Sequence, residues 1–248
     1  MSTIYVLWLR QLKRYFRSRS RIIGSLGQPI LFLVALGYGL GPVFAKAGGG
    51  SYLNFLVPGV IAQGIIFLAV FSGVELIWDR QFGFLKETLV APVSRFEIML
   101  GRTLGGATIA VFQGIMIFIL SLIVGFRPVS LVSLPIALLV MFLISLFYTA
   151  VGTAIASLLE DFHGFQLIMN FLVMPSYFLS GALFPLQGVP KLLQTITSLN
   201  PLSYGVDGLR QTLVNVSHFG LASDILILTL LSLIVLAIGS FLFSKIEA

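Results

Sequence analysis

Six long apolar stretches, separated by short polar segments, constrain this 248-residue chain more than any other feature. A helix of about 20 residues spans the ~30 Å hydrocarbon core of a bilayer, and each stretch is about that long or longer. With 58% hydrophobic and 10% charged residues, the chain is too apolar for a soluble protein. The sequence therefore predicts an all-α polytopic membrane protein, a single domain over 1–248, with spans at about 22–44, 53–78, 95–125, 131–159, 165–184 and 223–243.

The main polar interruption runs from Asp79 to Arg102 and carries seven charged residues. At roughly 2.5–3.5 kcal/mol for each charge at a bilayer centre, this segment cannot lie in lipid. Its apolar residues recur at helical spacing, with two charged residues off that face, which predicts a short amphipathic helix. The apolar residues are Phe82, Leu85 and Leu89, and the charged ones are Lys86 and Glu87.

Two further signals end this short helix and begin the next one. The residue before Pro92 is disfavoured in helical conformation, so the helix ends there. Ser94 followed by Glu97 is a capping-box pattern that starts the third span. A helix on the membrane surface, followed by a break and a newly capped span, is a shape on which a partner could push. We therefore predict that 79–94 transmits force from a partner to the spans.

Residues 1–21 predict an interfacial helix rather than a span. Its basic residues share one stripe and its aromatic residues lie opposite. The basic stripe is Arg10, Lys13, Arg14, Arg17 and Arg21, and the opposite face is Tyr5, Trp8, Leu12, Tyr15 and Phe16. The basic stripe faces anionic headgroups or a protein partner, or it only sets the topology. Because the basic residues flank apolar spans, the net charge of +6 indicates membrane lipids and no nucleic-acid partner.

The distribution of basic residues also predicts the orientation. Of the Lys and Arg residues, eleven fall in the N-terminal arm, the central polar segment and the tail, and four fall elsewhere. The positive-inside rule therefore places both termini in the cytoplasm of a cell membrane. With six spans, the segment 187–214 then lies on the outer face.

The segment 187–214 contains two helices that are too short to cross. Ten residues from Pro190 rise only about 15 Å. Asn200-Pro201 is a strong start for the second helix, in which Asp207 and Arg210 are an expected i, i+3 pair. Ser223-Asp224 is the expected start of the last span.

The residues present exclude several kinds of chemistry. No G-x-x-x-x-G-K-[ST] motif occurs, so any ATP that drives transport binds to a partner. There is no cysteine, and His163 and His218 fall in predicted loops, so we predict no catalytic residues and no metal site. An ion-coupled secondary transporter is the alternative from another class. Such transporters usually place ionisable groups near the bilayer midplane, whereas Glu75 is expected near a helix end, which argues against proton coupling.

Two segments resemble the ABC-2 family of ABC exporter permeases: LKETLVAPVSRFEIMLGR (85–102) and FLSGALFPLQGVPKLLQTITSLNPLSYGVDGLR (178–210). The resemblance covers essentially the whole chain. It implies an amphipathic N-terminal helix, a coupling helix after the second span and a re-entrant outer hairpin before the sixth. It also implies a homodimer and ABC ATPase partner subunits that bind ATP and Mg, so this chain itself carries no cofactor. The chain looks most similar to the drug and antibiotic exporters of the inner membrane (multidrug resistance), although polysaccharide and lipo-oligosaccharide exporters share the signature.

The family pattern assigns residues to two tasks. Coupling to the ATPase falls on Phe82, Leu85, Lys86, Glu87, Leu89, Pro92 and Arg95. The resemblance implies that spans two and five line the substrate path, where they offer Gln63, Phe67 and Phe71, and Asn170, Met174, Tyr177 and Phe178. Aromatic rings, a methionine and two amides without net charge suit a hydrophobic or amphiphilic substrate, such as a drug, a lipid-like molecule or a glycolipid. The competing interpretation is packing in the core or against lipid, with the amides bonded across helices.

Overall fold

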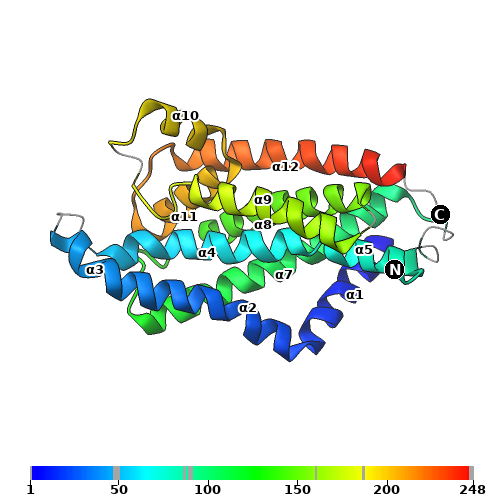
Figure 1. Ribbon diagram of the computed structural model, residues 1–248, viewed down its shortest axis with the longest axis horizontal. Coiled ribbons are helices and arrows are strands. Elements are labelled where there is room, and N and C mark those ends of the chain that lie inside the picture. The colour runs from blue at the N-terminus through cyan, green and yellow to red at the C-terminus, as the bar shows by residue number, and fades with distance from the viewer. Residues whose placement is uncertain are drawn as a thin grey trace.

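The computed structural model describes residues 2–46, 51–85, 88, 92–159, 161–185 and 188–245. Every regular element in these ranges is a helix, as the sequence predicts. The longest helices lie side by side in an elongated bundle (Figure 1). The elements are α1 (Thr3–Arg17), α2 (Arg19–Leu31), the π-helical turn η1 (Phe32–Leu36), α3 (Gly37–Lys46), α4 (Tyr52–Phe71), α5 (Val74–Gln81), α7 (Arg95–Val124), α8 (Leu134–Leu158), α9 (Phe162–Phe178), α10 (Lys191–Leu199), α11 (Pro201–Val214) and α12 (Leu221–Ser244).

Within the described residues, five helical stretches are long and apolar enough to cross a membrane. They are Arg19–Phe44, Tyr52–Gln81, Arg95–Val124, Leu134–Leu158 and Leu221–Ser244, and each overlaps a predicted span. Helix α9 overlaps the remaining predicted span, but its 17 residues rise only about 25 Å. It ends at Phe178 rather than near residue 184, because the chain turns at Gly181, whose φ is +75°.

Local signals account for most of the helix starts. The capping box forms as predicted, since the Ser94 hydroxyl accepts from the Glu97 amide and the Glu97 side chain accepts from the Ser94 amide. Asp161 caps α9, and Asn200 caps α11, with proline at its first position. The predicted start of the last helix at Ser223-Asp224 is wrong: α12 begins at Leu221, and Asp224 is buried in its first turn.

Helix α4 occupies the centre of the bundle, and every residue from Leu56 to Ile66 is buried. Small residues permit the close crossings. A Cβ on Gly152 of α8 would collide with the Val70 carbonyl oxygen at the end of α4. A Cβ on Gly59 of α4 would lie 2.9 Å from the Cβ of Ala182. Helices α4 and α8 therefore approach at backbone distance, as is common among membrane helices, and α4 approaches the turn after α9 equally closely.

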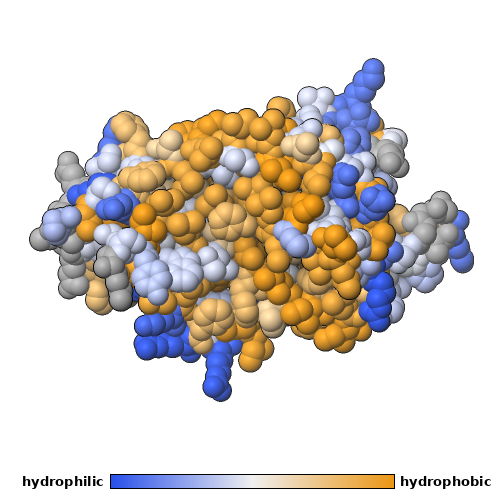
Figure 2. Space-filling model, turned by 180° about the vertical axis from the view of Figure 1, so that it is seen from behind, coloured by the Kyte–Doolittle hydropathy of each residue, from blue (hydrophilic) through white to orange (hydrophobic). Residues whose placement is uncertain are grey.

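The surface is divided as a membrane protein requires. On the face seen in Figure 2, apolar side chains cover most of the middle, and hydrophilic ones gather toward both ends and at one place along the lower edge. Helix α1 and the end of α12 lie at the same end of the bundle as α5, and α10 and α11 lie at the opposite end (Figure 1). The chain is thus a multi-pass membrane protein.

Helix α1 forms as predicted, but the face it buries differs from the prediction. Leu7, Gln11 and Tyr15 are buried, whereas Tyr5 and Phe16 are about half exposed. The cause is a glycine groove on α7. A Cβ on Gly101 would lie 3.0 Å from the Cβ of Leu7, and one on Gly105 would collide with the Gln11 side chain. Helix α1 therefore packs on protein along one stripe rather than lying wholly in the acyl boundary.

Candidate substrate cavity and coupling network

A cavity of about 360 Å³ lies between α2, α4 and α5, with single residues contributed by α7 and α9. Figure 1 shows α4 running between α2 and α9. The lining is mostly apolar and aromatic, with a few amide and hydroxyl groups. Its volume is at the small end of the roughly 300–1,000 Å³ range of ligand sites.

The three residues predicted on the second span all line this cavity. Gln63, Phe67 and Phe71 recur along α4, and Phe71 also meets Phe165 edge to face, with ring centroids 6.5 Å apart. The Gln63 side chain is 2% exposed, and its Oε1 has no hydrogen-bond partner among the described residues. The family resemblance indicated this span, and helical spacing placed the three residues on one of its faces.

The four residues predicted on the fifth span do not join this group. Asn170, Met174 and Phe178 are exposed on the outside of α9. Tyr177 is fully buried and meets Phe32 of η1 edge to face, with ring centroids 6.4 Å apart. The structure thus brings together the α4 set but places the α9 set on two different faces.

Helix α2 supplies a wall of the cavity that the sequence analysis did not single out. Two polar connections fasten it to the bundle. The Ser25 hydroxyl donates to Gln113 Oε1 at 2.9 Å, and Gln113 Nε2 donates to the Ser25 carbonyl at 2.9 Å. Arg21 pairs with the buried Glu75 of α5 at 3.0 Å. Beyond the cavity α2 passes through Pro29 into η1, where the π-helical turn interrupts the regular ladder.

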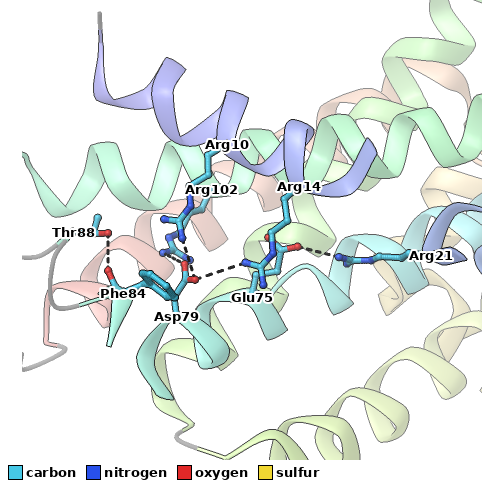
Figure 3. Close-up of polar contacts among 8 residues, drawn as sticks. All are labelled: Arg10, Arg14, Arg21, Glu75, Asp79, Phe84, Thr88 and Arg102. Atoms are coloured by element: carbon cyan, nitrogen blue, oxygen red, sulfur yellow. Dashed lines mark hydrogen bonds and ion pairs between the residues drawn. The ribbon is translucent and has the colours of Figure 1, made fainter. Parts of the chain in front are cut away.

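Next to the cavity, Asp79 on α5 is the centre of an ionic network (Figure 3). Its carboxylate accepts from Arg102 of α7 at 2.6 Å and from Arg10 of α1 at 3.3 Å, and Arg14 lies 3.7 Å away. Asp79 and Arg102 are both about 95% buried. One carboxylate therefore joins α5, α1 and α7 at the point where the predicted coupling segment, 79–94, begins.

Four of the seven predicted coupling residues lie within the part of the chain that the structure describes. Phe82 is 72% exposed and Leu85 is 2% exposed, so the segment has one buried and one free apolar side chain. Thr88 donates to the Phe84 carbonyl at 3.1 Å, and both residues are helical. Pro92 is exposed and Arg95 is half-buried at the first position of α7. Lys86, Glu87 and Leu89 lie outside the described residues.

At the opposite end of the bundle, the predicted Asp207–Arg210 pair is wrong. Asp207 accepts from the backbone amides of His218 and Phe219 and from the Ser217 hydroxyl, at 2.7–3.0 Å. Arg210 donates to the Gly181 carbonyl at 3.0 Å and lies 4.3 Å from the centre of the Phe55 ring. Helix α11 is buried against α4, α8 and α12, and the hydrogen bonds of Asp207 go to the loop after α11 while that of Arg210 goes to the turn at Gly181.

Comparison with known proteins gives one consistent result. A family model described as ABC-2 type transporter matches residues 2–214. The chain is 34% identical over 211 residues to "Putative transport permease ycf38" of Porphyra purpurea, covering 84% of this chain and 72% of the relative. It is 28% identical to "Nodulation protein J" of Rhizobium leguminosarum bv. trifolii, over 83% of this chain and 76% of that protein. It is 25% identical to "Inner membrane transport permease YadH" of Escherichia coli K12, over 88% and 85%.

Proposed function

This chain belongs to the ABC-2 type transporter family, and we propose that it is the transmembrane permease subunit of an ATP-driven exporter of a hydrophobic or amphiphilic substrate. The observation that carries the proposal is the cavity between α2 and α4. Its walls are aromatic, aliphatic and amide, and its charged residues Arg21 and Glu75 neutralise each other. Such a lining suits an apolar or amphiphilic molecule and offers an ion nothing to compensate its charge.

The proposed topology has six spans, with α9 as the fifth and both termini in the cytoplasm. In support, α9 runs from the end that holds α5 to the end that holds α10 and α11 (Figure 1). Helix α11 is largely buried among longer helices while α10 is largely exposed, as a hairpin that dips into the outer face would be. The basic residues of α1 and of the Asp79 network then lie on the cytoplasmic side.

Coupling to ATP hydrolysis is proposed to pass through the segment 79–94. This segment starts at Asp79, which contacts Arg10 and Arg102, so a force on the segment reaches α1 and α7 directly. The partner is an ABC ATPase that binds ATP and Mg, and the working unit is a homodimer of this chain with two such subunits. Phe82, exposed next to this network, is a candidate contact for the ATPase.

The proposal is tested by purifying the protein from its native membrane and identifying what accompanies it. A stoichiometric ATPase with a P-loop supports the proposal, whereas transport by this chain alone under a proton gradient contradicts it. Glu87→Lys then tests the coupling segment. This variant is expected to hydrolyse ATP without transport, while the amount of inserted protein stays the same. If coupled transport is unchanged, the charges of the segment only set the topology.

A further inference from the structure

Asp224 is the only charged residue of α12 and lies in its first turn. The side chain is fully buried, and neither of its carboxyl oxygens has a hydrogen-bond partner in the part of the chain that the structure describes. The other buried acids of that part are partnered, since Glu75 and Asp79 pair with arginines and Asp207 accepts from backbone amides. Asp224 is thus a buried acid that nothing compensates.

The acid lies where α8, α11 and α12 pack together. A Cβ built on Gly208 of α11 would lie 3.5 Å from the Cβ of Asp224 and 3.2 Å from Cγ1 of Val140 on α8. Helix α8 contains no Lys, Arg, His, Asp or Glu over its whole length, Leu134–Leu158. It therefore supplies apolar contact at Val140 and no charge.

Among the described residues around Asp224, no titratable side chain supplies a counter-charge. These side chains are Tyr204, Asp207 and Arg210 of α11, Tyr148 of α8, and His218 of the loop after α11. The Arg210 guanidinium donates to a carbonyl of the turn after α9 and lies over an aromatic ring of α4. His218 is exposed, and Asp207, which does act on Asp224 electrostatically, is an acid itself.

Asp207 is held as a carboxylate by the loop that follows α11. Its two oxygens accept from the amides of His218 and Phe219 and from the Ser217 hydroxyl, at 2.7–3.0 Å. Donors of this kind favour the ionised form of an acid, and one carboxylate disfavours a second negative charge beside it. Two neighbouring acids in such different surroundings divide the roles, so that one is ionised and the other keeps its proton.

An ionised Asp224 would be a buried charge without a hydrogen bond or a counter-ion. The start of a helix favours negative charge, but by much less than the loss of hydration disfavours an unpaired carboxylate. A metal ion requires several ligands, and no group of three or more His, Cys, Asp or Glu in the described ranges could hold one. A proton alone is enough to neutralise the acid.

We propose that Asp224 is a proton-binding site, occupied at neutral pH, whose proton allows α11 and α8 to pack against the start of α12. Loss of the proton places two negative charges where α11 meets α12 and loosens this junction. Residues 215–218 of the connecting loop are exposed, so the site responds to the solution at the end of the bundle that holds α10 and α11 (Figure 1). This site is separate from the cavity and goes beyond ATP-driven export.

Infrared spectroscopy observes the proton directly, because a carboxylic acid and a carboxylate absorb at different frequencies. The purified full chain is compared at neutral pH with protein that contains isotope-labelled aspartate. We expect an acid band that shifts with the label and is absent from Asp224→Asn, which has the shape and neutrality of the protonated acid. Asp161→Asn, which changes an exposed acid at the start of α9, is the matched control and is expected to keep the band.

The pH dependence of unfolding gives the sign and the size of the effect. The folded protein holds a proton at Asp224 that an unfolded chain releases above about pH 4. Because the folded state binds more protons, stability falls as pH rises, until the folded protein also releases this proton. Between about pH 5 and 7, the equilibrium constant for unfolding in mixed micelles is expected to rise about tenfold more per pH unit in the unaltered protein than in Asp224→Asn. Asp161→Asn is expected to keep the slope of the unaltered protein.

Three results would overturn the proposal: no acid band in the unaltered protein, a band that survives in Asp224→Asn, or equal pH slopes in these two proteins. If Asp224→Asn does not fold, the labelled unaltered protein still decides, since its acid band either shifts with labelled aspartate or does not. ATP-driven export is measured separately in the complex with its ATPase, so failure of that proposed function leaves the proton site unaffected.

Discussion

Replacing Asp79 by Asn is the perturbation for which the structure gives the clearest expected magnitude. The carboxylate lies 2.6 Å from Arg102, and the two side chains are 6% and 5% exposed. Asn keeps the shape but removes the charge, so the buried Arg102 guanidinium beside Arg10 loses its hydrogen-bonded counter-charge and keeps only the more weakly interacting Glu75. Breaking a buried pair in this way costs about 3–5 kcal/mol. At about 2–4 °C for each kcal/mol in a chain of this size, unfolding is expected roughly 6–20 °C lower.

The assay is thermal unfolding of the purified protein, followed by tryptophan fluorescence in one detergent at fixed concentration. Arg10→Gln is the matched control, because Arg10 contacts the same carboxylate but is 43% exposed. It is expected to cost at most about 1 kcal/mol, as exposed ion pairs do. The double variant Asp79→Asn with Arg102→Gln removes both buried charges and is expected to recover much of the lost stability.

The refuting results are specific. If Asp79→Asn unfolds within about 1 °C of the unaltered protein, the carboxylate is not what compensates Arg102. If the double variant is as unstable as the sum of its single changes, the two charges do not interact energetically. Either result would remove the ionic link between the coupling segment and α7.

Five further substitutions test other parts of the account. Gly152→Ala is expected to lower the free energy of unfolding by about 1–3 kcal/mol because the new methyl collides with the Val70 carbonyl. Gly39→Ala, whose new methyl meets nothing within 4 Å, is expected to stabilise the protein by about 0.5–1 kcal/mol. If Gly152→Ala unfolded at a higher temperature than Gly39→Ala, the close approach of α8 to α4 at Gly152 would be contradicted. Ser94→Ala removes the cap of α7 and is expected to cost about 0.5–2 kcal/mol, so an unchanged unfolding temperature would count against that cap. Phe71→Ala is expected to reduce export of a hydrophobic dye while the protein level stays normal. Tyr177→Ala leaves a fully buried site empty and is expected to lower the protein level as well as export. If the two variants behave alike, Phe71 serves packing and not the substrate path.

The features that the sequence predicted well are those that depend on residues close to one another along the chain. The capping box at Ser94, the cap at Asp161 and the start at Asn200-Pro201 each depend on residues within one helical turn. Five of the predicted spans, those that match helices long and apolar enough to cross a membrane among the described residues, likewise follow from length and composition. The family resemblance indicated the second span, and helical spacing along it grouped Gln63, Phe67 and Phe71 on one face, which lines the cavity.

The features that the sequence could not predict depend on contacts between distant residues. Asp79 is 69 residues from Arg10, and Ser25 is 88 residues from Gln113. No periodicity within one helix indicates which neighbour a polar side chain meets. The glycines of α7 allow α1 to pack on protein, and the backbone amides of the loop after α11 bind Asp207. The buried face of α1 and the partners of Asp207 therefore differ from the prediction because tertiary packing overrides a local pattern.

The central claim is tested most directly by ATP-dependent transport in proteoliposomes that contain this chain and the ATPase that co-purifies with it. The measured quantity is the transfer of a fluorescent amphiphile from the ATPase-exposed leaflet to the opposite side, with and without ATP and Mg. The account predicts transfer that requires both subunits and stops when the ATPase P-loop lysine is changed. Transfer by this chain alone at the same rate, or transfer that follows an ion gradient and ignores ATP, would contradict it.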